Sequence, residues 1–84
     1  MNLKLKYICD PGHGWLQVPK SIVVKSGVKK QITPYSYQDK YFFYLEEDCD
    51  ASLFVDRAKE LGWTVEFQQE HTNYDSFIRN LPSV

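Results

Sequence analysis

At the start of the chain, apolar residues at positions 3, 5, 7 and 9 alternate with Lys4 and Lys6. This period of two predicts a strand with one buried and one solvated face. An Asp-Pro-Gly sequence at residues 10–12 interrupts the pattern, because proline cannot donate to a ladder and glycine adopts the backbone of a tight reversal. We therefore expect the chain to turn back and form a second strand over residues 15–18.

Residues 20–26 carry signals for two different structures. Pro19 and Gly27 suit the two ends of a short helix, since proline is favoured in a first turn and glycine just after a last one. Residues 22–24 are all β-branched, however, and this favours a short strand. The pattern leaves both structures open.

A further hairpin is predicted where residues 32–37 pair with residues 41–45 through a turn at residues 38–40. Pro34 would place the first arm at the edge of the sheet. Residues 41–45 are Tyr-Phe-Phe-Tyr-Leu, apolar or amphipathic on both faces. This composition favours a central strand that is covered on both sides.

The clearest helical pattern covers residues 51–61. Its apolar positions recur about every 3.6 residues and form a single stripe, made of Ala51, Phe54, Val55, Ala58 and Leu61. Leu53 falls on the polar side of that stripe. Gly62 suits the position after the helix, from which Trp63 can pack back on Ala58 in a Schellman ending.

The last third of the chain predicts two more elements. Residues 63–67 alternate again and indicate a half-buried strand with a polar far face. Asn73 or Asp75 suits the cap of a short helical segment that carries Phe77, Ile78 and Leu81 and stops at Pro82.

These elements predict an α+β fold in one domain spanning residues 1–84. We expect a small, mainly antiparallel sheet with one main helix (51–61) packed on one face, and one or two short helices. A chain of 84 residues with 43% hydrophobic residues builds one modest core. No apolar run reaches the roughly 20 residues of a membrane helix, and no secretory apolar block is present, so a cytoplasmic location is expected.

Four residues of the chain are of the types that bind zinc: Cys9, His13, Cys49 and His71. Their spacing argues against a zinc site, because structural sites bring ligands in tight pairs and only Cys9 and His13 lie close in sequence. Free thiols are the expectation for both cysteines. The sequence therefore predicts no cofactor, with the metal site kept as an alternative.

His13 is the candidate for acid–base chemistry. It lies between two glycines, and Asp10 three residues earlier would suit a carboxylate that orients one ring nitrogen. The alternative is a turn histidine, because Asp-Pro-Gly has a full explanation as turn chemistry. We favour the turn and lean against an enzyme.

An acidic run at residues 46–50 includes Glu46, Glu47 and Asp48. It lies where the main helix should begin, so Asp48 or Asp50 suits a helix cap, and an acidic binding surface is the alternative. Lysines at positions 20, 25, 29 and 30 precede several tyrosines, a pattern that also occurs in single-strand nucleic-acid binders. The net charge of −1 argues against that function.

Aromatic residues make up 15% of the chain. Their side chains present more surface than one amphipathic helix can cover. We expect part of it to lie in an interface with a partner protein, since tyrosine and tryptophan are enriched there. The predicted apolar anchors are Trp15, Tyr35, Tyr37 and Tyr44. Glu46, Glu47 and Asp48 would form a charged rim that steers a basic target.

Four segments span most of the chain: DPGHGWLQVP at residues 10–19, YSYQ at 35–38, YLEEDCD at 44–50 and SFIRNLP at 76–82. In these segments the chain resembles a family of small uncharacterised proteins carried by phages, prophages and plasmids. That family has no assigned activity, so the resemblance transfers no catalytic or binding residue. It implies an accessory protein of a mobile element, for which blocking host machinery is a common role.

The leading hypothesis is a noncatalytic protein that binds and inhibits or modulates a host protein in the bacterial cytoplasm. An anti-defence inhibitor, similar in kind to anti-CRISPR proteins, is one such role. The alternatives are a small enzyme or metal-binding protein centred on His13, and a nucleic-acid-binding module. The sequence leaves the partner and the oligomeric state open, a homodimer included.

Overall fold

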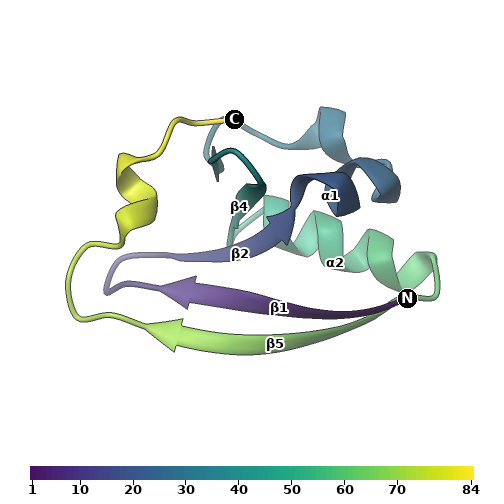
Figure 1. The fold of residues 1–84 in the computed structure, drawn as a ribbon, viewed down its shortest axis with the longest axis horizontal. Helices are drawn as coiled ribbons and strands as arrows, with labels where there is room; N and C mark the ends of the chain where they lie inside the picture. Colours follow the sequence, from purple (N-terminus) through teal and green to yellow (C-terminus); the bar gives the residue numbers. More distant parts are fainter.

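The two alternating segments at the start of the chain form the first hairpin, as predicted. The computed structural model describes residues 1–84, and its elements follow in chain order (Figure 1). They are β1 (Asn2–Cys9), β2 (Gly14–Pro19), α1 (Lys20–Ser26), the 3-10 turn η1 (Lys29–Gln31), β3 (Tyr37–Gln38), β4 (Phe42–Glu46), α2 (Asp50–Glu60), β5 (Thr64–His71) and the 3-10 turn η2 (Phe77–Asn80). None of the helices has both the length and the apolar character needed to cross a membrane.

The five strands form one mixed sheet in the order β3-β4-β2-β1-β5. Three of its strand pairs are antiparallel, and β1 pairs in parallel with β5 from Asn2↔Thr64 to Cys9↔His71. The predicted α+β class is therefore confirmed, with one parallel pair at the edge that the sequence pattern did not indicate. β4 lies between β3 and β2, which confirms the predicted central strand.

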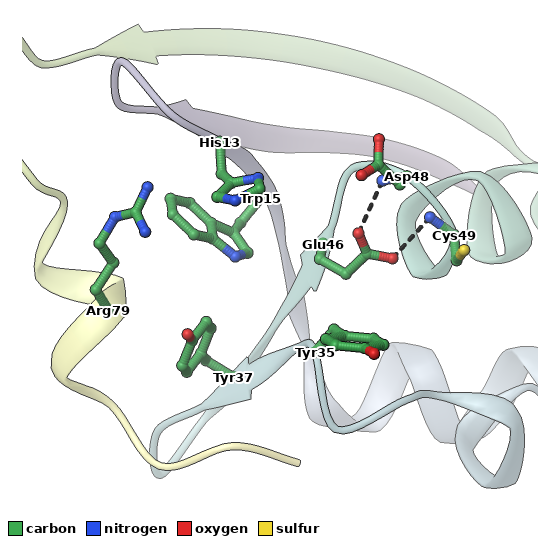
Figure 2. Close-up of a pocket in the computed structure, with 8 residues that line it drawn as sticks. All are labelled: His13, Trp15, Tyr35, Tyr37, Glu46, Asp48, Cys49 and Arg79. Atoms are coloured by element: carbon green, nitrogen blue, oxygen red, sulfur yellow. Dashed lines mark hydrogen bonds between the residues drawn. The ribbon is translucent and has the colours of Figure 1, made fainter.

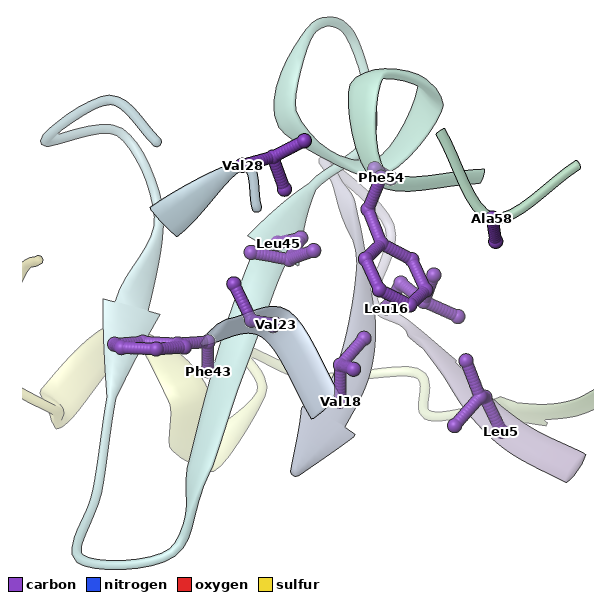
Figure 3. Packing of buried hydrophobic residues seen from close by; sticks show 10 residues of the cluster. Leu5, Leu16, Val18, Val23, Val28, Phe43, Leu45, Phe54 and Ala58 are labelled. Atoms are coloured by element: carbon purple, nitrogen blue, oxygen red, sulfur yellow. The ribbon is translucent and has the colours of Figure 1, made fainter. Parts of the chain in front are cut away.

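One face of the sheet packs against α1 and α2 (Figure 3). Because side chains alternate along strands, Leu16 and Leu45 meet on this face from neighbouring strands. Phe54 of α2 inserts among them and is completely buried. The buried cluster consists of Leu5, Leu16, Val18, Val23, Val28, Phe43, Leu45, Ala51, Phe54 and Ala58. Leu53 packs against it too, whereas Leu61 is 38% exposed, so the predicted stripe was wrong at these two positions.

The opposite face is covered by the C-terminal segment. Ile78 of η2 packs on Ile8, Trp15 and Tyr44 in a second buried cluster. Trp15 and Tyr44 are each only 2% exposed. The prediction that these two side chains form an exposed apolar surface was therefore wrong. It considered only the main helix as a covering element, whereas η2 covers this face. Uncovered aromatic surface is found at Tyr35, whose side chain is 77% exposed.

Both helices end at a glycine in the left-handed region. Gly62 has a φ of +78°, and the backbone N–H of Trp63 donates to the carbonyl of Ala58 at 2.9 Å, which confirms the predicted Schellman ending. Gly27 has a φ of +89° after α1. The helical alternative for residues 20–26 is thus the correct one.

The predicted strand over residues 32–37 was wrong except at its last residue. The loop is held by Asp50, whose buried carboxylate accepts hydrogen bonds from the Thr33 N–H (2.9 Å), the Thr33 hydroxyl (2.8 Å) and the Ser36 hydroxyl. These bonds replace ladder hydrogen bonds, so β3 keeps only two residues. At η2, the capping residue is Ser76, which accepts from the Ile78 N–H at 3.3 Å, and neither Asn73 nor Asp75 caps it.

Candidate functional site

A cleft of about 430 Å³ opens between the sheet, the segment before α2 and η2 (Figure 2). Trp15 and Tyr37 rise from the sheet face opposite the helices, and Arg79 approaches from η2. The cleft brings together five of the seven predicted partner-binding residues. Its lining consists of His13, Trp15, Tyr35, Tyr37, Glu46, Asp48, Cys49 and Arg79. Tyr44 and Glu47, the other two predicted residues, do not line it.

The floor of the cleft is a group of packed rings around Trp15. The Trp15 and Tyr37 rings meet edge to face, with centroids 6.1 Å apart, and the His13 ring lies 6.0 Å away on the other side. The guanidinium carbon of Arg79 lies 5.3 Å from the Trp15 ring. Such contacts fix the ring orientations, so the floor is rigid, while Tyr35 stands free beside it.

An ion pair between the buried Asp10 and the half-buried Arg79 holds the wall of the cleft near His13. The carboxylate of Asp10 accepts two hydrogen bonds from Arg79, from Nε at 2.6 Å and from Nη2 at 2.9 Å. It also accepts backbone N–H groups from Gly12, His13 and Ser76. The Arg79 guanidinium, together with these N–H donors, holds the pKa of Asp10 far below its usual range. A Cβ atom at position 12 would come within 2.8 Å of Arg79 Nη2, so a larger residue there would displace the guanidinium that bonds Asp10.

The geometry corrects the predicted pairing of Asp10 with the His13 ring. Asp10 accepts the backbone N–H of His13, and the ring nitrogen Nδ1 lies 3.5 Å from Glu47 Oε1 instead. The Tyr7 hydroxyl donates to Glu47 Oε2 at 3.0 Å. Burial, and then this hydrogen bond, raises the pKa of Tyr7 to about 12. The half-exposed His13, which lines the cleft, therefore belongs to a His–Glu–Tyr row whose other two members lie outside it.

The acidic wall contains one carboxylate with a structural role and one without. Glu46 accepts the backbone N–H groups of Asp48 (2.9 Å), Cys49 (2.7 Å) and Asp50 (3.0 Å) at the start of α2. Burial alone would raise the pKa of Glu46, but these three donors outweigh it and hold the pKa below its usual value. Capping was predicted for Asp48 or Asp50, but neither side chain caps the helix; Cys49 is the N-cap residue, and the Glu46 carboxylate binds the N–H groups that lead into α2. The exposed Asp48 carboxylate makes no ion pair or hydrogen bond.

The four candidate metal ligands do not converge. No group of three or more His, Cys, Asp or Glu side chains is arranged to hold a metal ion. Cys9 and Cys49 are free thiols, the first half-buried and the second exposed at the cleft. Burial raises the pKa of Cys9. His71 lies opposite Cys9 in the register of β5 and β1, outside the cleft.

The predicted lysine and tyrosine pattern is also divided by the fold. The Nζ atoms of Lys20 and Lys29 lie 5.1 and 5.3 Å from the ring centre of Phe43, which faces the helices. Tyr37 lies on the other face of the sheet, because it pairs with Tyr44. Tyr37 therefore does not share one surface with Lys20 and Lys29, as a stacking site for a nucleic-acid strand would require.

Sequence reasoning missed Arg79, the cationic member of the cleft. Its one signal was a charged residue inside the short apolar segment at residues 77–81. Its partner Asp10 is 69 positions away, so no local pattern joins the two. Comparison with known proteins adds no assignment: no protein-family model, curated protein or solved structure matches this chain.

Proposed function

We propose that this chain is a noncatalytic binding protein that docks on a host protein through the aromatic cleft and inhibits or modulates it. The bacterial cytoplasm is the proposed site of action. The resemblance to phage and plasmid proteins supports an accessory role on a mobile element, with anti-defence inhibition as one form of it.

The observation that carries the proposal is the composition of the cleft. Five of the seven residues predicted from sequence to bind a partner line one cavity: Trp15, Tyr35, Tyr37, Glu46 and Asp48. Tyr35 is 77% exposed beside a rigid aromatic floor, and aromatic anchors next to preformed pockets are where binding energy concentrates in interfaces. Asp48 adds an unpaired negative charge at the rim, which favours a basic partner surface.

Two exposed tyrosines make a matched test. Tyr35→Ala removes the side chain at the cleft, and Tyr74→Ala removes an equally exposed one (78%) outside it. The tagged protein is used to capture a host protein from lysate, and the purified partner is then titrated against each variant. We expect Tyr35→Ala to weaken binding at least tenfold, about 1.4 kcal/mol, and Tyr74→Ala to leave it unchanged. Equal affinities for all three proteins would refute the role of the cleft.

A second candidate function is supported by the His13–Glu47 pair. A carboxylate 3.5 Å from Nδ1 can hold an imidazole in the orientation that general acid–base catalysis needs, and Cys49 lines the same cleft. This candidate predicts turnover of small ester or thioester substrates that His13→Gln abolishes and Tyr74→Ala preserves. Identical rates for His13→Gln and the unmodified protein would eliminate it.

A further inference from the structure

The side chain of Trp15 contains a hydrogen-bond donor that the protein does not use. The residue is 2% exposed, and its indole N–H has no acceptor among the hydrogen bonds of the structure. No fully buried side-chain nitrogen or oxygen lacks a partner in this fold, so the indole N–H must open on the cleft that Trp15 lines. Figure 2 shows the indole nitrogen directed toward the space between Tyr35, Tyr37 and Glu46.

The surroundings of this donor select the kind of acceptor that it takes. A donor that no protein group uses, on a side chain that is almost wholly enclosed, is free to donate to a ligand oxygen that enters the cleft. The carboxylates of Glu46 and Asp48 line the same space. A negatively charged ligand that entered it would be repelled by them. The charge of Arg79 is already neutralised by its two hydrogen bonds to Asp10. A neutral carbonyl therefore fits here better than a carboxylate or a phosphate.

The opposite requirement applies at the rim of the cleft. Asp48 is an unpaired carboxylate that lines the same cleft as the exposed ring of Tyr35. A cation placed there gains from the carboxylate and from the ring face together. A planar guanidinium stacks on a ring while it hydrogen-bonds a carboxylate, and an ammonium cannot do both as well.

We propose that the cleft binds an arginine-bearing peptide segment. The Trp15 indole N–H donates to a backbone carbonyl of that segment, and the arginine side chain lies between the Tyr35 ring and the Asp48 carboxylate. This inference rests on the proposed function and specifies the chemistry of the partner. It assigns to Trp15 the role of a hydrogen-bond donor in the floor, in place of the apolar anchor expected from sequence.

The two tryptophans of the chain allow a direct test. In a ¹⁵N-labelled protein each gives one indole N–H resonance, and Trp63→Phe identifies the one from Trp15. The probes are two blocked tripeptides, acetyl-Gly-Arg-Gly-amide and the same peptide with citrulline, the neutral counterpart of arginine. We expect the Trp15 resonance to move saturably with the arginine peptide, with the Trp63 resonance fixed, and the citrulline peptide to bind about threefold more weakly.

A matched pair of aspartate variants tests the cation subsite. Asp48→Asn should remove the preference for arginine over citrulline, whereas Asp56→Asn, which changes another exposed aspartate on α2 outside the cleft, should retain it. A Trp15 resonance that does not move with the arginine peptide overturns the proposal. Equal affinity for the two peptides overturns it as well, and movement only with a nucleotide such as uridine monophosphate would assign the cleft to a nucleobase.

The same resonance separates this inference from the proposed function. The captured host protein can bind, and Tyr35→Ala can weaken that binding, without any movement of the Trp15 resonance in the complex. In that case the proposed function holds and this inference fails. If the arginine peptide moves the resonance but Tyr35→Ala and the unmodified protein bind the host protein equally, the peptide site stands and the docking function fails.

Discussion

Replacing Glu46 with glutamine should weaken the start of α2 by an amount that its contacts define. The carboxylate accepts three backbone N–H groups, two at Oε1 and one at Oε2. Glutamine keeps one carbonyl oxygen, so it loses at least one hydrogen bond, worth about 1 kcal/mol, and the attraction of a negative charge to the helix N-terminus, worth about 0.5 kcal/mol. The expected loss is about 1.5 kcal/mol in the free energy of unfolding.

Thermal and urea denaturation measure this loss. For a chain of this size, about 1.5 kcal/mol corresponds to a fall in Tm of roughly 8 °C. Because the pKa of Glu46 is lowered in the folded state, its stabilisation is complete above the unfolded pKa near 4.5 and is lost as the pH falls through the folded pKa. The difference between the two proteins should therefore shrink in acid.

Glu60→Gln provides the control, because Glu60 is exposed at the other end of the same helix, where a negative charge gains nothing from the dipole. Its unfolding free energy should change by less than about 0.5 kcal/mol. If Glu46→Gln is as stable as Glu60→Gln at neutral pH, or if its deficit does not diminish in acid, the Glu46 carboxylate does not stabilise the start of α2.

Three further outcomes follow from the fold. Phe54→Ala removes a fully buried ring and should cost about 4 kcal/mol in urea denaturation; a cost below about 2 kcal/mol would contradict its place in the core. Gly62→Ala meets no atom within 4 Å, so the positive φ alone should lower stability by about 1 kcal/mol, and an unchanged Tm would contradict this. Burial raises the pKa of Tyr44 to about 12, with a further contribution from its hydrogen bond to Asp39. The absorbance titration should therefore lose a late phenolate step in Tyr44→Phe, and an unchanged titration would refute the assignment.

The predictions that succeeded depend on local sequence. The helix over residues 51–61 has a stripe and a terminal Gly62, and both act within a few residues. The ending with Trp63 on Ala58 follows from them without knowledge of the rest of the chain. The same holds for the first alternating strand, β1, whereas in β5 the predicted buried face was wrong at Phe67, which is 55% exposed at the edge of the sheet.

The predictions that failed depend on which distant segments meet. In the acidic run, the carboxylate that binds the N–H groups leading into α2 is decided by where β4 ends, and this selects Glu46 over Asp48 and Asp50. Turn chemistry alone explained the presence of Asp10 in the Asp-Pro-Gly sequence. Nothing in that local pattern indicated its bond to Arg79. The C-terminal turn was predicted as an element, but its position over Trp15 could not be inferred without the strand order.

The parallel pairing of β1 with β5 has a consequence for how the molecule assembles. Its hydrogen bonds join residues some 62 positions apart along the chain, from Asn2 with Thr64 to Cys9 with His71. Closing so long a loop must precede most of the favourable contacts of that edge, which slows folding relative to a helical bundle of equal size. The nascent chain therefore carries an incomplete sheet until β5 has been synthesised, and its first strand exposes an unsatisfied edge to chaperones throughout that interval.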